Sequence, residues 1–187
     1  MGLWCASNNK VLNSPKYHSK IVYAISFLEN EMLSCAGDGN IIRHAENMTE
    51  GKIFHTESGG KFSAVSVSGD SELIALGFDS GKVEILNGAT LQKSQELSDF
   101  HSKYITVMKF SKTFFASASN SGSLVIHQIS DFGKLRRLAG HCDRISTLDF
   151  SPDESLLVTG SYDATAQIWR SRVKLHIVHV AYKCILF

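Results

Sequence analysis

The sequence contains few residues that interrupt or cross-link a chain, and it has no excess of charge of either sign. Among 187 residues there are 2 prolines and 4 cysteines, and the formal net charge is +1 at pH 7. A nearly neutral chain creates no broad field toward phosphate backbones or anionic membranes, so we expect neither nucleic-acid nor membrane binding. A run of about 18 apolar residues, which a membrane-spanning helix needs, is also missing.

The cysteines do not have the C-x-x-C spacing of a zinc site or the density of a disulfide scaffold. The first residues, MGLWCASNNK, lack the basic segment and apolar core of a secretory signal. Both absences favour a reducing compartment, and we expect a cytoplasmic or nuclear protein. A hydrophobic content of 43% is enough for a folded core.

What the sequence does contain is an internal repeat. A histidine and a phenylalanine stand nine positions apart in three segments, which begin at His18, His101 and His141. A fourth segment, beginning at Ser58, fits the same frame and restores a spacing of about 40 residues. We therefore divide the chain into repeats at about 18–57, 58–100, 101–140 and 141–170, preceded by a remnant of another unit at 1–17 and followed by a β-prone tail at 171–187.

Each repeat follows the same pattern of short strands and tight turns. Apolar and polar residues alternate after the histidine, and a second apolar strand ends in small residues. Turns such as Gly37-Asp38-Gly39 then reverse the chain toward a third strand. Four antiparallel strands per unit, without helical periodicity, predict an all-β propeller of about four blades, because one such sheet cannot cover both its faces.

The last repeat, GHCDRISTLDFSPDESLLVTGSYDATAQIWR, resembles the WD40 (WD-repeat) β-propeller family over nearly its full length. The resemblance implies that His141, Thr159, Asp163 and Trp169 form a hydrogen-bonded chain that holds the blade's loops. The first repeat keeps His18, Ser34 and Asp38, with His44 at the tryptophan position. The third keeps His101 and Ser117, with Ser121 at the aspartate position and His127 at the tryptophan position.

Propellers of this family usually close a ring of seven blades, and an open ring leaves a strand edge and a blade face uncovered. We therefore expect an incomplete ring. The favoured explanation is that the chain is part of a longer protein that supplies the missing blades, and the alternative is that two chains complete a ring. The tail at 171–187 is either an outer strand of the fourth blade or sequence unrelated to the family.

We expect no enzyme activity, cofactor or metal. The histidines at the repeated position are explained by the repeat, and no Gly-x-Ser-x-Gly elbow, phosphate loop or kinase signature is present. His176 and His179 would point to opposite faces of a strand, which argues against joint metal binding.

The resemblance implies that partner proteins bind the narrow top face of the propeller, around its central channel. Aromatic residues and arginine, which are enriched in interface hot spots, occur among the residues carried over to that face. These are Ile21, Tyr23, Lys61, Ser63, Asp79, Tyr104, Thr106, Asn120, Arg144, Ser146 and Tyr162. The competing interpretation is that Tyr23 and Tyr104 only pack between blades.

Two functions are compatible with these features. The first is a scaffold or adaptor that joins proteins in a complex without catalysis. The second is a targeting or regulatory propeller within a larger protein that is an enzyme or a regulator of membrane traffic or the cytoskeleton.

Overall fold

The computed structural model describes residues 3–5, 10–13, 17–28, 31–45, 51–55, 60–133, 135–170 and 182–183. Every regular element in these ranges is a β-strand, and the all-β prediction is confirmed. Among the described residues there is no helix of the length and apolarity that a bilayer crossing requires. Ser58, His176, His179 and most of the tail lie outside the described residues.

Four sheets of four antiparallel strands form the body of the molecule, in the strand order of a simple meander. Blade 1 contains β3 (Val22–Leu28), β4 (Glu31–Ala36), β5 (Asn40–His44) and β6 (Gly51–His55). Blade 2 contains β7 (Phe62–Val67), β8 (Leu73–Phe78), β9 (Val83–Asn87) and β10 (Lys93–Leu97). Blade 3 contains β11 (Ile105–Phe110), β12 (Phe114–Ser119), β13 (Leu124–Gln128) and β14 (Leu135–Leu138). Blade 4 contains β15 (Ile145–Phe150), β16 (Leu156–Ser161), β17 (Thr165–Arg170) and β18 (Tyr182–Lys183).

The ends of the chain contribute strands as well. The short strands β1 (Leu3–Cys5) and β2 (Lys10–Asn13) pair with each other in a separate two-stranded sheet. At the other end, Tyr182 and Lys183 pair with Ala166 and Thr165. This part of the tail therefore occupies the outer-strand position of blade 4.

The local sequence explains the strands and their irregularities. In β7, buried and partly exposed side chains alternate, as the two-residue period of a strand requires. The first two strands of every blade shift register at the same place, between Val22 and Ala24 in blade 1 and between Ile145 and Thr147 in blade 4. Such a bulge increases local twist, so its repetition gives the inner strands a common shape.

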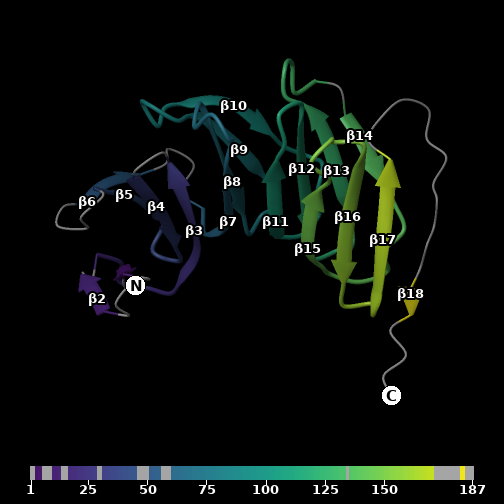
Figure 1. The fold of residues 1–187 in the computed structure, drawn as a ribbon, viewed down its shortest axis with the longest axis horizontal. Coiled ribbons are helices and arrows are strands. Elements are labelled where there is room, and N and C mark those ends of the chain that lie inside the picture. Colours follow the sequence, from purple (N-terminus) through teal and green to yellow (C-terminus); the bar gives the residue numbers. More distant parts are fainter. Residues whose placement is uncertain are drawn as a thin grey trace.

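The blades stand side by side in a row, with blade 1 and blade 4 at opposite ends (Figure 1). Their inner strands contact in order, β3 with β7, β7 with β11 and β11 with β15. A hydrophobic cluster fills each junction. Leu33 of blade 1 packs in the same cluster as Phe62 and Phe78 of blade 2, and Ala118 of blade 3 shares a cluster with Trp169 of blade 4. Apolar burial between neighbouring sheets thus supplies the core.

One face of blade 1 has no neighbouring blade among the described residues. Ile25 is 58% exposed and Phe27 is 70% exposed. The residues at the same repeat positions in blade 3, Met108 and Phe110, are 5% and 7% exposed, because blade 2 covers them. The row of blades therefore ends in an uncovered apolar face.

Candidate partner-binding face

The loops at the top of blade 4 are held by a chain of buried polar side chains. His141 Nδ1 donates to Asp163 Oδ2 at 2.9 Å, and Thr159 donates to His141 Nε2 at 2.8 Å. The indole Nε1 of Trp169 donates to Thr159 Oγ1 at 2.9 Å. Thr165, which the sequence did not single out, donates to Asp163 Oδ1 at 2.5 Å. Each polar group has a partner, which offsets the cost of burying it.

The carboxylate of Asp163 stays charged well into acid. Burial alone would raise its pKa, but hydrogen bonds from Thr165, His141 and the backbone of Cys142 hold this pKa well below its usual range. The negative charge keeps the His141 Nδ1 proton directed at Asp163, which fixes the tautomer used by the rest of the chain.

Blade 1 contains a related network with a second histidine in place of the tryptophan. Ser34 Oγ lies 2.7 Å from His18 Nε2 and 2.8 Å from His44 Nε2, and His18 Nδ1 lies 3.2 Å from Asp38. Burial, followed by the charge of His18, lowers the pKa of His44. The Nδ1 atom of His44 is buried without a partner.

Blade 3 lacks the carboxylate and uses another serine than the one expected. His101 Nδ1 lies 2.6 Å from Ser123 Oγ, and His101 Nε2 lies 2.9 Å from Ser117 Oγ. Ser121, which the sequence placed at the aspartate position, instead contacts Ser119 and Ser123. Without a carboxylate, burial together with Arg137 and His127 lowers the pKa of His101 to about 4. His127, at the tryptophan position, donates from Nδ1 to the Phe132 carbonyl oxygen at 2.8 Å.

These networks position the loops around a pocket of about 350 Å³. Blades 1, 2 and 3 contribute to its wall together with Arg144, the residue directly before β15 of blade 4. Seven of the residues proposed for the top face line it: Tyr23, Lys61, Ser63, Asp79, Tyr104, Thr106 and Arg144. Phe62 and Ile105 complete the lining. The register of the inner strands thus brings together side chains from residue 23 to residue 144.

The other four proposed residues, Ile21, Asn120, Ser146 and Tyr162, are not part of the pocket wall. Ile21 is 70% exposed and Tyr162 is 65% exposed. The backbone N–H of Asn120 donates to the Tyr104 carbonyl oxygen at 3.0 Å, and the hydroxyl of Ser146 donates to the Gly160 carbonyl oxygen at 3.2 Å. Both contacts hold loops and strands within a blade.

Arg144 is the charged centre of the pocket wall. Its guanidinium carbon lies 5.9 Å from the centre of the Tyr104 ring and 5.1 Å from that of Tyr162, so the cation is held between two aromatic faces. The Nε atom of Arg144 and the Oγ atom of Ser63 are both buried without a hydrogen-bond partner. Tyr104 therefore has a structural role between blades and also faces the pocket.

Thr106 has less freedom to bind a partner. Its hydroxyl lies 2.6 Å from the Ile145 carbonyl oxygen of blade 4 and 3.1 Å from the Ala118 carbonyl oxygen of its own blade. A hydroxyl has one proton to donate, and here that proton joins two blades. Thr106 thus helps to set the distance between the walls of the pocket.

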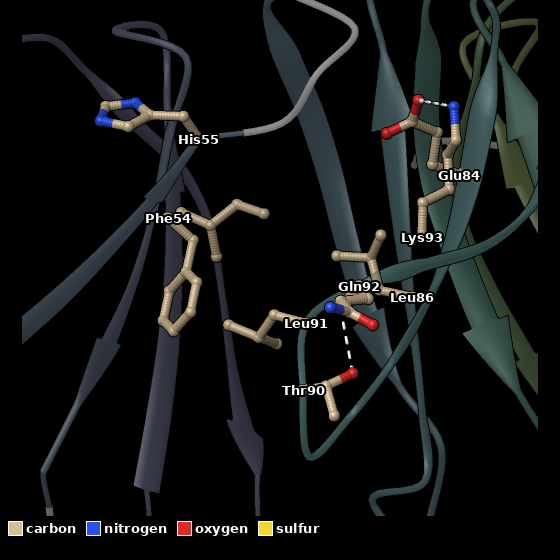
Figure 2. Close-up of a pocket in the computed structure, with 9 residues that line it drawn as sticks. Phe54, His55, Glu84, Leu86, Thr90, Leu91, Gln92 and Lys93 are labelled. Atoms are coloured by element: carbon tan, nitrogen blue, oxygen red, sulfur yellow. Dashed lines mark hydrogen bonds and ion pairs between the residues drawn. The ribbon is translucent and has the colours of Figure 1, made fainter.

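A second pocket, of about 420 Å³, opens at the outer side of the junction between blades 1 and 2 (Figure 2). Phe54, Leu86 and Leu91 form its apolar part, and Glu84 faces Lys93 at one end (Figure 2). Glu84 is only 1% exposed, yet its carboxylate lies 3.1 Å from Lys82 Nζ and 3.7 Å from Lys93 Nζ. The charge here is already balanced within the protein.

Glu84 was not among the predicted site residues, although the sequence pattern around it is unusual. A single acidic residue interrupts the apolar third strand of blade 2, in Lys82-Val83-Glu84-Ile85-Leu86. A charge at a buried strand position requires a partner. Neither pocket contains metal-binding geometry: no group of three or more His, Cys, Asp or Glu in the described part of the chain is arranged to hold an ion.

The segment that contains the polar chain of blade 4 matches a known protein family. Residues 132–170, which include all of the polar chain from His141 to Trp169, match the family described as "WD domain, G-beta repeat". This segment is a WD repeat. The first and third repeats, with His44 and His127 at the tryptophan position, are more divergent than this last one.

Over most of its length the chain is similar to much longer proteins. It is 26% identical to Gem-associated protein 5 of Mus musculus over 225 residues, which cover 90% of this chain and 14% of that protein. It is 32% identical to the U4/U6 small nuclear ribonucleoprotein PRP4 of Saccharomyces cerevisiae over 114 residues, which cover 57% of this chain and 24% of that protein. The chain therefore spans a minor part of these relatives.

A solved structure matches the fold more completely. The computationally designed Ika4 protein superimposes with a TM-score of 0.74 at 24% identity, covering 85% of this chain and 96% of the designed chain. At this level of identity the match concerns the fold alone.

Proposed function

We propose that this chain is a protein-interaction scaffold that docks partner proteins on its top face, at the 350 Å³ pocket. The convergence of Tyr23, Tyr104 and Arg144 on one concave site carries the proposal. Tyrosine and arginine supply a large share of binding energy in protein interfaces, and a rigid set of blades presents them with little loss of entropy.

The repeated histidines support a non-catalytic role. His18, His101 and His141 each use both ring nitrogens in contacts that hold the blade together. Gem-associated protein 5 and the ribonucleoprotein PRP4 carry names that place them in multiprotein assemblies. By analogy, the chain would join proteins in a complex in the cytoplasm or nucleus.

The test replaces three side chains at the site together. Tyr104→Ala, Arg144→Ala and Tyr162→Ala remove both aromatic faces and the cation between them. We expect the triple variant to lose at least ten-fold in the recovery of partners captured by the immobilised wild-type chain, measured by quantitative mass spectrometry. Circular dichroism should show an unchanged β-signal.

Arg136→Ala provides the control, because Arg136 is an exposed cation on the outer strand β14. This variant should capture the same partners as the wild-type chain. Equal capture by the triple variant and the control would refute the proposed docking face.

A second candidate function is a targeting or regulatory propeller within a larger protein, such as an enzyme or a regulator of membrane traffic or the cytoskeleton. The coverage of only 14% of Gem-associated protein 5 favours it. The apparent mass of the native protein, detected with an antibody against blades 3 and 4, separates the candidates. A native mass near 20.6 kDa would exclude the larger protein.

A further inference from the structure

Among the buried or half-buried cations in the described part of the chain, Arg144 is distinguished by the lack of an acidic partner. Arg43 pairs with Glu31, and Lys82 pairs with Glu84. Lys109 pairs with Asp149 even though both side chains are more than half exposed. Among the described residues, Arg144 has two aromatic contacts but no ion pair, and its Nε atom is buried without an acceptor.

The aromatic contacts stabilise the cation without neutralising it. Rings 5.9 Å and 5.1 Å away attract a guanidinium through their quadrupoles, and they also restrict its orientation. A ring face does not accept the in-plane N–H bonds of arginine as a carboxylate oxygen does. A buried N–H that finds no acceptor costs about 1–3 kcal/mol, so this position gains affinity when an acceptor arrives.

The remaining polar groups of the pocket complement a small anion. Ser63 has a buried hydroxyl without a partner, and it lines the same pocket as Arg144. Lys61 adds a second cation at an exposed position, whereas Asp79 is the one acidic residue of the lining. Two cations and one carboxylate leave an excess charge of about +1 for a ligand to balance.

We infer that this pocket binds the carboxylate of an aspartate or glutamate side chain of a partner protein. Arg144 donates to the carboxylate, Ser63 donates from its hydroxyl, and Lys61 attracts the side chain at the mouth. Tyr23, Tyr104 and Phe62 contact the methylene groups. The inference rests on the proposed docking face and names the chemistry of its anchor.

The excess charge favours a carboxylate over a phosphate. A phosphorylated side chain carries about −1.5 to −2 charges at pH 7 and three acceptor oxygens. Asp79 in the same wall would repel that second charge. A monovalent anion fits this site, which offers one guanidinium, one ammonium and one hydroxyl and contains a single aspartate.

The experiment selects peptides on the whole chain from a phage-displayed library of random 12-residue sequences. The best binder is then synthesised in three forms, with glutamate, glutamine or phosphoserine at its most strongly selected acidic position. We expect glutamine to raise the Kd for the wild-type chain about ten- to hundred-fold, the range for hydrogen bonds to a charged group. Phosphoserine should bind more weakly than glutamate.

Variants of the chain identify the atoms involved. Arg144→Gln should lower the affinity for the glutamate peptide to that for the glutamine peptide, so that the two peptides bind alike. Ser63→Ala should weaken the glutamate peptide several-fold and the glutamine peptide less. Because the Ser63 hydroxyl has no hydrogen-bond partner among the described residues, this variant keeps the test valid if Arg144→Gln folds poorly.

The outcomes separate this inference from the docking proposal. If selected peptides lose binding to the Tyr104, Arg144 and Tyr162 triple variant but show no acidic preference, the docking face stands and the carboxylate anchor is wrong. Tighter binding of phosphoserine also overturns the carboxylate. Both proposals are refuted if the selected peptides bind the triple variant as tightly as the wild-type chain. Both are also refuted if the selection yields no peptide with a Kd below 100 µM, which corresponds to about −5.5 kcal/mol of binding free energy.

Discussion

Three tight turns between the second and third strands of blades 1 to 3 use glycine in the left-handed region. Gly39, Gly81 and Gly122 have φ values of 79°, 87° and 77°. In blade 4 the same position is Ala164, with φ 63°. A Cβ atom on Gly122 would lie 2.6 Å from the His141 carbonyl oxygen of the next blade. Glycine at this turn therefore serves the contact between blades as well as the local conformation.

Opposite effects are expected from exchanging these residues. Gly122→Ala should lower the free energy of unfolding by about 2–4 kcal/mol, because the methyl group meets the next blade and alanine is strained at positive φ. Ala164→Gly should change it by only about 0 to 1 kcal/mol in the stabilising direction, since relief of strain exceeds the added freedom of the unfolded chain. Urea unfolding measures both, and a tolerated Gly122→Ala would contradict the close approach.

At the scale of the element, the polar network of blade 3 should respond to mild acid. The pKa of His101 is lowered from 6.5 to about 4 in the folded protein, so between these values the unfolded chain binds the additional proton. Stability therefore rises with pH across this window, and the part due to His101 is lost as pH falls from 6.5 toward 4. Blade 4 keeps its Asp163 charge in the same range, because the pKa of this carboxyl is lowered.

The corresponding measurement is urea unfolding at pH 7 and pH 4.5. His101→Gln should reduce the difference in unfolding free energy between these two pH values by about 2–3 kcal/mol, because the interval from pH 6.5 to pH 4.5 spans about two pH units. His55→Gln, on an exposed position of β6, is the matched control. An identical pH dependence in wild type and His101→Gln would show that the buried imidazole does not titrate as proposed.

At the scale of the whole molecule, residues at the same repeat position differ in burial, because the outer face of blade 1 has no neighbouring blade among the described residues. Met108→Ser in blade 3 should cost about 3 kcal/mol, because its side chain is 5% exposed in the junction with blade 2. Ile25→Ser in blade 1 should cost less than about 1 kcal/mol, since Ile25 is 58% exposed.

Thermal unfolding of the two variants at several protein concentrations tests this difference. Equal destabilisation, growing with concentration for Ile25→Ser, would show that another molecule covers the blade 1 face in solution. The exposed row formed by Ile25 and Phe27 would then be an interface rather than a free surface.

The sequence by itself determined the strands, the turns and the type of network inside each blade. These depend on contacts within about 40 residues: alternation sets which side chains are buried, glycine and aspartate set the turns, and the spacing from His141 to Trp169 sets the polar chain. Even within a blade, the sequence did not decide whether Ser121 or Ser123 contacts His101. Side chains two residues apart can point the same way, and the structure shows that Ser123 is the partner.

Only the tertiary structure decided what meets between blades. The position of Arg144 beside Tyr104 of the neighbouring blade and the pocket shared by Arg144 and Ser63 result from side chains on separate blades. A period in the sequence states that blades repeat, but it does not state how one sheet is rotated against the next. That rotation follows from the packing of the junctions, and it creates the pocket from residues more than 100 positions apart in the chain.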